Sequence, residues 1–288
     1  MNENPTTTGY LAAACFDGAD AAAFLHGQFS ADIAALPPAR WRRAAYCSPK
    51  GRALATMIVA RRDGGFVVLL PASLADSVAA GLSRFVLRAK VKISRPPCAV
   101  DARVSAADFV VAADGGGVIE EEDGALEIDE GGGARLRLRF DSAAAADGDD
   151  AAWRRMQILR GVPWIDSATS GRFVPQYFNW DLLGGVSFQK GCYVGQEIIA
   201  RLHYLGNVRR RGYILRGGGP PPAAGEKIGA AEVINAAPDG DGFAAFVVAP
   251  RDFGDAPQDE KPAAELAEPP YGLPSAAEEQ KPKPKVGA

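Results

Sequence analysis

A single cysteine, Cys192, lies in a sequence context that favours thiol chemistry. Its octet comprises Lys190, Gly191, Cys192, Tyr193, Val194, Gly195, Gln196 and Glu197. The apolar residues Ile198, Ile199 and Leu202 follow it, so the octet is predicted to lead into a helix. A helix N-terminus carries about half a positive charge and a nearby lysine adds to it, so both favour the thiolate. We therefore predict Cys192 as a functional thiol assisted by Lys190; a buried structural cysteine is the alternative.

The remaining metal-binding and nucleophilic residue types are scattered along the chain. Cys15, Cys47 and Cys98 form no C-x-x-C pair, which argues against a disulfide framework and a zinc knuckle. One thiol and two histidines cannot supply the ligands of a stable cluster, so Cys192 is expected to be at most a transient metal ligand. A nucleophilic pair of Cys192 with His203 lacks a third, orienting group.

The densest basic segment recognised in the sequence spans residues 201–216. It contains Arg201, Arg209, Arg210, Arg211 and Arg216, interleaved with Tyr204 and Tyr213. Such a segment is compatible with a surface that contacts RNA or an acidic partner. The net charge of −3 indicates no general affinity for polyanions. A solvated strand face is therefore the favoured interpretation, and RNA contact is not required.

The composition is typical of a folded protein with a sizeable core. Hydrophobic residues make up 47% and charged residues 23% of the 288-residue chain. No apolar run is long enough to span a bilayer, so no membrane association is expected. Residues 1–5 carry no basic segment, which argues against a signal peptide or a mitochondrial presequence. Together with the separated cysteines, these features predict a cytoplasmic protein.

The N-terminal part of the chain shows an α+β pattern. The predicted elements are a strand at 10–16, a helix from Ala21 to about Ile33 capped by Asp20, a hairpin of strands 53–60 and 66–70, a helix from Ser73, and a strand at 91–94. Strands and helices in this order predict an α+β subdomain, which we place at residues 1–95.

A second α+β subdomain, a small β domain and a tail are expected to follow. The predicted elements are a strand at 136–140, a linker at 141–150, a helix from about Ala151 to Arg160 ended by Gly161, and short strands at 208–215, 227–234 and 243–248. We place the second subdomain at 96–205 and a small antiparallel β-barrel at 206–254. Residues 255–288, rich in Pro, Ala, Glu and Lys, are expected to form a disordered tail.

The octet around Cys192 resembles the K-G-C-Y-x-G-Q-E pattern of the YgfZ family. Other matching segments are 24–28, 50–52, 161–166, 171–176, Asn179 and 184–188, so the resemblance covers roughly residues 10 to 250. Proteins of this family are folate-binding, GcvT-like, and tied to iron–sulfur cluster assembly and tRNA modification. The resemblance implies two related α+β subdomains around a central cavity, a small C-terminal antiparallel β-barrel, and Cys192 as the working thiol.

The resemblance also implies a folate site, with tetrahydrofolate or a related folate as cofactor. A tryptophan at the place of Trp153 stacks against the folate in similar proteins, whereas without the family Trp153 is predicted to be a core residue. An aromatic face with a few polar groups suits a flat pterin ring. A second aromatic residue is expected in the first strand, but the aligned residue is Leu11, with Tyr10 beside it. Both are included as candidate folate contacts.

Aminomethyltransferases of the glycine cleavage system are the enzymatic relatives of this family. They use an acidic residue in a Gly-Gly-Ile-x-Asp-Asp segment beside the folate. The matching stretch here is residues 51–56, in which Ala55 and Thr56 occupy the acidic positions. Neither side chain acts as a general base, so the sequence argues against aminomethyl transfer.

The combined interpretation is a cytoplasmic, folate-binding factor for the assembly or repair of iron–sulfur enzymes, including those that thiolate tRNA. Its expected partners are iron–sulfur enzymes or cluster-assembly proteins, and a maintenance role is favoured over an enzymatic one. Cys192 would attack, relay sulfur or transiently ligate iron. Two alternatives stay open: a folate-dependent one-carbon transferase, and a non-catalytic adaptor that binds its partner through residues 201–216.

Overall fold

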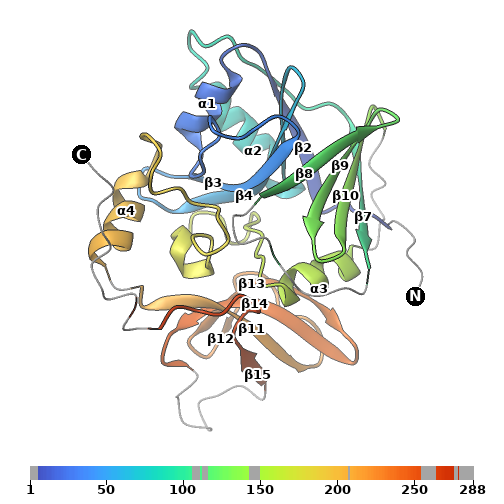
Figure 1. The fold of residues 1–288 in the computed structure, drawn as a ribbon. Coiled ribbons are helices and arrows are strands. Elements are labelled where there is room, and N and C mark those ends of the chain that lie inside the picture. The colour runs from blue at the N-terminus through green and yellow to red at the C-terminus, as the bar shows by residue number, and fades with distance from the viewer. Residues whose placement is uncertain are drawn as a thin grey trace.

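Two antiparallel sheets organise the chain (Figure 1). The computed structural model describes residues 6–105, 111, 116–142, 150–206, 208–253, 264–275 and 278. The larger sheet contains the strands β1 (Thr6–Thr7), β2 (Leu11–Asp17), β3 (Arg40–Cys47), β4 (Ala53–Arg62), β5 (Gly65–Pro71), β6 (Lys92–Ser94), β7 (Cys98–Val104), β8 (Gly116–Glu122), β9 (Ala125–Gly131) and β10 (Ala134–Phe140). Their order across this ten-stranded sheet is β1-β7-β10-β9-β8-β3-β4-β5-β2-β6.

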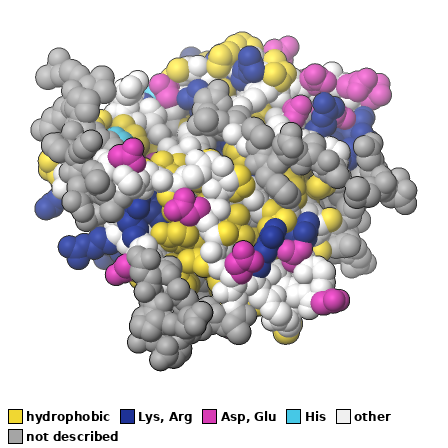
Figure 2. Space-filling model, turned by 60° about the horizontal axis from the view of Figure 1, so that its bottom comes forward, with side chains coloured by type: hydrophobic (Ala, Val, Ile, Leu, Met, Phe, Trp, Pro, Cys, Tyr) yellow, Lys and Arg dark blue, Asp and Glu magenta, His cyan; other side chains and the backbone are white. Residues whose placement is uncertain are grey.

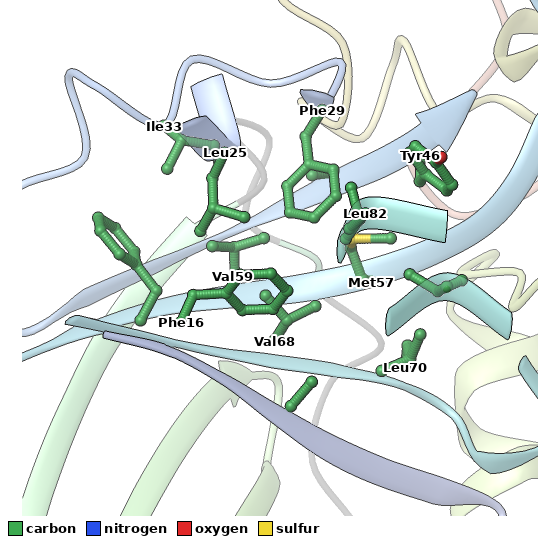
Figure 3. Close-up of a cluster of buried hydrophobic side chains, with 14 of the residues drawn as sticks. Phe16, Leu25, Phe29, Ile33, Tyr46, Met57, Val59, Val68, Leu70 and Leu82 are labelled. Carbon is green, nitrogen blue, oxygen red and sulfur yellow. The ribbon is translucent and has the colours of Figure 1, made fainter. Parts of the chain in front are cut away.

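The strands β2, β4 and β5 are buried on both faces, which explains their nearly continuous apolar sequences. Successive side chains of a strand point to opposite faces of its sheet. Met57 and Val59 of β4 therefore face a core that they share with α1 (Ala21–Gln28) and α2 (Ala72–Ser83), as Figure 3 shows. Ile58 and Ala60 face a second core, which β7, β9, β10 and α3 (Ala151–Leu159) complete.

The first helix is shorter than predicted, and a strand absent from the prediction follows it. α1 ends at Gln28 rather than near Ile33, because the backbone of Phe29 is extended and bridges to Tyr46 of β3. Long-range pairing with β3 therefore overrides the helical pattern of residues 29–33.

The strands β7 to β10 continue the first sheet and do not start a separate one. The continuity comes from β8, whose residues 116–118 pair with residues 40–42 of β3. The boundary predicted between residues 95 and 96 thus falls between β6 and β7 of one sheet. The division into two α+β subdomains stays a proposal, while the mixed α+β architecture is confirmed.

The second sheet lies at the bottom of Figure 1, where the sequence predicts a small antiparallel barrel. Its strands, in spatial order, are β12 (Lys227–Ile228), β13 (Ala231–Asp239), β14 (Gly242–Pro250), β11 (Arg210–Gly218) and β15 (Ala264–Ala267). Figure 2 shows this side of the molecule, where acidic and basic side chains are interspersed around a band of hydrophobic ones. None of the described helices has the length and apolarity needed to span a bilayer.

Part of the expected disordered tail is folded. The strand β15 pairs with β11, with Leu266 opposite Leu215, and Tyr271 packs against the core between the two sheets. For residues 264–275 the prediction of disorder is therefore wrong. Composition indicated too few apolar residues to order this segment, but Leu266 and Leu273 pack on the second sheet while β11 satisfies the backbone of β15. The rest of the predicted tail, except residue 278, lies outside the described residues.

Candidate functional site

The predicted functional thiol lies in a loop that leads into α4 (Gln196–Leu205). Cys192 is exposed, three positions before Gly195, the residue that caps this helix. Gly195 has a φ of +82°, and a Cβ added to it would lie 3.0 Å from the Cα of Gly51. Glycine is therefore required for both the backbone conformation and the close approach. As a result, the Lys50–Arg52 turn and the Cys192 octet, far apart in the sequence, are packed together.

Lys190 anchors this loop to the segment after α1. Its side chain is 8% exposed, and its Nζ donates hydrogen bonds to the carbonyl oxygens of His26, Phe29 at 2.6 Å and Ala31 at 3.0 Å. Burial lowers the pKa of Lys190 to about 8. Because the ammonium group is committed to these carbonyls, its visible role is to hold the loop. That Lys190 also favours the Cys192 thiolate stays a prediction.

The other octet residues take different environments. Tyr193 is buried in the core between the sheets, 4.9 Å from the Lys190 ammonium to its ring centroid, and burial raises its pKa. Gly191 is exposed, Gln196 is half-buried, and Glu197 is exposed in the first turn of α4, where an acid complements the helix dipole.

The three other cysteines differ from Cys192 in being buried. Burial raises the pKa of Cys47 and of Cys98 to about 12, and it also raises the pKa of Cys15. A buried thiol with a raised pKa is a poor nucleophile. Cys192 is therefore the cysteine best placed to react with a partner in solution.

His26 is a neighbour of this loop that the sequence patterns do not predict. Its Nε2 lies 3.7 Å from the position that a Cβ on Gly191 would occupy, and its Nδ1 lies 3.1 Å from Asp32 Oδ1. Burial, followed by the Lys190 ammonium, lowers the pKa of His26 below its ordinary value. His203, the histidine considered from the sequence, instead stacks on Phe188 with ring centroids 3.5 Å apart. The only sequence signal for His26 was its place in the matching segment 24–28.

A second group of candidate residues surrounds Trp153. This side chain, on α3, is 2% exposed, and its ring centroid lies 6.1 Å from that of Tyr10 and 5.6 Å from that of Trp164. Tyr10 is thus beside Trp153, and Leu11 is buried in the same core as Trp153 and Trp164. Trp164 was not singled out from the sequence, because its segment was recognised only as part of a longer match.

Polar groups line the same aromatic group. The side-chain amide of Asn235 on β13 donates to Tyr10 Oη at 3.1 Å and to the Trp164 carbonyl oxygen at 2.8 Å. Gln157 Nε2 donates to Glu130 Oε2 at 2.7 Å. Gln157 Oε1 and Trp164 Nε1 are buried and lack a hydrogen-bond partner among the described residues. Buried unpartnered atoms are costly, so they mark a place where a ligand or a water would be stabilised.

The residue types fit a flat heterocycle, but the space between them is small. The cavity that Tyr10, Trp153, Trp164 and Asn235 line has a volume of about 10 Å³. That volume suits roughly one water molecule. A pterin ring would therefore have to replace the contacts that the aromatic rings make with one another, which requires Tyr10 or Trp164 to move.

The positions of the missing acids are part of the core. Ala55 and Thr56 are fully buried, and Thr56 Oγ1 accepts a hydrogen bond from the backbone N–H of Ile165 at 2.9 Å. The nearby carboxylate of Asp166 accepts bonds from the Ala168 N–H and the Thr169 hydroxyl within its own turn. Thr56 is thus committed to the backbone of the segment that carries Trp164.

The arginines of the predicted basic segment 201–216 differ in exposure: Arg211 is buried, Arg210 is half-buried, and Arg201, Arg209 and Arg216 are exposed. Arg211 is buried, and its guanidinium binds both carboxylate oxygens of Asp181 at 2.7 and 3.2 Å. Arg210 donates to the Val248 carbonyl, and Arg216 pairs with Asp239. The three arginines on β11 thus have partners within the protein, although Arg216 stays exposed. Among the described residues no cluster of ligand side chains could hold a metal ion.

Comparison with known proteins places the chain in a family. No family model matches it. A "tRNA-modifying protein YgfZ" from Klebsiella pneumoniae is 34% identical over 238 residues, covering 75% of this chain and 73% of the relative. The protein of the same name from Sodalis glossinidius is 32% identical, with 74% and 71% covered. In structure, the glycine cleavage system aminomethyltransferase T of Bartonella henselae matches with a TM-score of 0.65 at 15% identity, over 86% of this chain and 78% of the other. The fold is therefore GcvT-like, and the chain belongs to the YgfZ family.

Proposed function

We propose that this protein is a cytoplasmic, folate-binding factor that acts in the assembly or repair of iron–sulfur enzymes, including those that modify tRNA. The observation that carries the proposal is the exposed Cys192, held at the start of α4 by the buried contacts of Lys190 and Gly195. The names of the relatives support a role in tRNA modification. The fold shared with an aminomethyltransferase supports a scaffold related to folate binding.

Cys192 is the functional thiol in this proposal. The exposed thiol can form and release a covalent or metal bond with a partner without unfolding of the loop, because the loop is held by its neighbours Lys190 and Tyr193. His26, whose pKa burial and the Lys190 ammonium lower, lies beside Gly191 and is a titratable side chain next to this loop. Either kind of bond at Cys192 suits a relay of sulfur or a transient ligand better than a resident cluster.

Folate is proposed to bind against Trp153. A bound tetrahydrofolate would supply one-carbon chemistry. This chain's own residues would stack on its ring and bind its polar edge, through the free Gln157 Oε1 acceptor and the free Trp164 Nε1 donor. Ala55 and Thr56 carry no carboxylate at the positions that are acidic in aminomethyltransferases, so aminomethyl transfer is not part of the proposal.

Genetic complementation tests the proposal as a whole. A strain that lacks the gene is expected to lose tRNA thiolation and the activity of several iron–sulfur enzymes, and wild type but not Cys192→Ser should restore both. Cys98→Ala, which removes a buried thiol, is the matched control and should complement. Full complementation by Cys192→Ser would reject the thiol role.

A turnover assay separates this proposal from the one-carbon transferase. The purified protein with methylene-tetrahydrofolate, ammonia and a lipoylated carrier should give no product above background. Sustained turnover would move the protein to the transferase class.

A further inference from the structure

The segment that follows α2 concentrates positive charge on the surface. Residues 84–95 contain Arg84, Arg88, Lys90, Lys92 and Arg95 and no acidic residue, in a chain whose net charge is −3. All five basic residues are exposed. In residues 201–216, the basic segment recognised in the sequence, Arg210, Arg211 and Arg216 instead contact the Val248 carbonyl oxygen, Asp181 and Asp239.

The segment separates its apolar anchors from its basic side chains. Val86, Ala89, Val91 and Ile93 pack against the core under α1 and α2. The intervening residues, which point the other way, are Arg84, Phe85, Leu87, Arg88, Lys90 and Lys92. The result is a surface of basic and large apolar side chains on a backbone that is fixed from beneath; we call it the 84–92 surface.

Hydrogen bonds hold this backbone in place. The N–H of Lys90 donates to Asp20 Oδ2 at 2.7 Å, and its carbonyl oxygen accepts from the Asp20 N–H at 3.3 Å. Asp20, expected from the sequence to cap α1, is thus used to fix the segment. The Ala89 N–H donates to the Val86 carbonyl oxygen at 3.1 Å. A ligand would therefore meet basic groups whose backbone is already ordered.

The basic side chains of the 84–92 surface are available to a ligand. Arg95 pairs with Asp76, whereas Arg84, Arg88, Lys90 and Lys92 make no ion pair with any residue that the structure describes. Four basic residues within nine positions, none of them in such an ion pair, favour an anion that lies across them. A polyanion can meet several of these charges at once, whereas a single small anion cannot.

Two large apolar side chains lie exposed among these charges. Leu87 is 91% exposed and Phe85 is 49% exposed. Basic groups interleaved with an exposed aromatic ring are typical of surfaces that bind phosphates and stack on unpaired bases. An acidic segment of carboxylates alone would match the charges but offer no flat ring for Phe85.

We propose that the 84–92 surface is an RNA-contact site, in which the four basic residues bind backbone phosphates and Phe85 with Leu87 contacts an unpaired base. None of its residues belongs to the Cys192 loop or to the aromatic group at Trp153. The site is thus independent of folate binding, and only the choice of tRNA as probe rests on the proposed function.

Fluorescence anisotropy with a labelled tRNA transcript over a KCl series tests the site. Replacing Arg84, Arg88, Lys90 and Lys92 together by Gln should weaken binding at least tenfold. The same variant should reduce the slope of log K against log salt by about 3, at about 0.7 to 0.9 per phosphate. The double variant Phe85→Ser with Leu87→Ser should weaken binding with the slope unchanged. The matched control is Arg201→Gln with Arg209→Gln, which removes two exposed charges elsewhere and should bind as wild type.

Each outcome of this binding experiment either supports or overturns the proposed RNA site. Equal tRNA affinity of wild type and the quadruple variant, or an equal loss in the Arg201/Arg209 control, would overturn the site. Displacement of the tRNA by polyglutamate as effectively as by unlabelled RNA would assign the surface to acidic proteins instead. Folate-induced quenching of tryptophan fluorescence in the same variants shows whether the folate proposal fails separately.

Discussion

Tyr271 Oη donates a hydrogen bond to the Gly161 carbonyl oxygen, 2.8 Å away, and so ties the C-terminal segment to the end of α3. The same hydroxyl accepts a bond from Asn179 Nδ2 at 3.1 Å. Gly161 has a φ of +72°, and a Cβ added to it would lie 2.7 Å from the Tyr271 ring. A segment that composition predicted to be disordered therefore packs against the C-terminal end of the helix that carries Trp153.

Removal of the C-terminal segment should destabilise the protein. A chain ending at Gly254 loses β15 and Tyr271, so one edge of β11 is left unpaired and the Gly161 carbonyl oxygen loses its hydrogen bond from Tyr271. Tyr271→Phe alone should lower the free energy of unfolding by about 1–2 kcal/mol. Urea denaturation measures the effect of the truncation and of Tyr271→Phe, with a chain ending at Glu278 as control. Equal midpoints for the shortened chain and the full chain would show that the segment does not contribute.

Lys190→Met should destabilise the fold and loosen the Cys192 loop. The substitution leaves the Phe29 and Ala31 carbonyl oxygens without their donor, at a cost of about 1–3 kcal/mol in the free energy of unfolding. Lys50→Met, at an exposed lysine, is the matched control and should leave the midpoint unchanged. Hydrogen exchange of residues 26–31 reports the local effect, and unaltered protection in Lys190→Met would contradict the anchoring role.

From the lowered pKa of Lys190 we also expect the free energy of unfolding to depend on pH. Burial lowers its pKa to about 8 from the ordinary value of 10.5. Between these values the unfolded chain keeps a proton that the native protein has released, so the contribution of this group to the free energy of unfolding rises with pH. The stability of wild type relative to Lys190→Met should therefore increase from pH 8 to about 10. A difference that falls over this range would mean that the native pKa is not lowered.

Cys192 should be alkylated first among the cysteines. It is exposed, whereas burial raises the pKa of Cys47 and Cys98 to about 12 and shields both thiols. Limiting iodoacetamide at pH 7 to 9, followed by peptide mass spectrometry, measures the order in which the cysteines are alkylated. Cys192→Ser should leave the native protein almost unlabelled, and rapid labelling of a buried cysteine would require an opening of the core.

Folate should quench tryptophan fluorescence through Trp153 and Trp164. The two rings lie 5.6 Å apart, and a pterin that separates them would contact both. Trp153→Ala should weaken tetrahydrofolate binding by at least tenfold. Trp180→Phe, in the core between the sheets, is the control and should bind normally. Unchanged affinity in Trp153→Ala, with an unchanged melting temperature, would remove this residue from the site.

The chain's local patterns were enough to predict several elements and the candidate thiol. The hairpin of β4 and β5 follows from apolar runs on both sides of Asp63-Gly64, and α3 from its helical spacing before Gly161. Such signals act over a few residues, where backbone geometry and turn chemistry decide the structure. The thiol octet was recognisable for the same reason, because its residues are contiguous.

The tertiary structure decided which distant residues meet. Lys190 binds carbonyl oxygens about 160 positions earlier, Trp164 joins Tyr10 and Trp153, and Tyr271 reaches Gly161. Strand order likewise buried Arg211 against Asp181 and left the 84–92 surface exposed. These pairings depend on sheet order and on the burial of whole faces, which act between segments far apart in the chain and leave no periodic signal within any one of them.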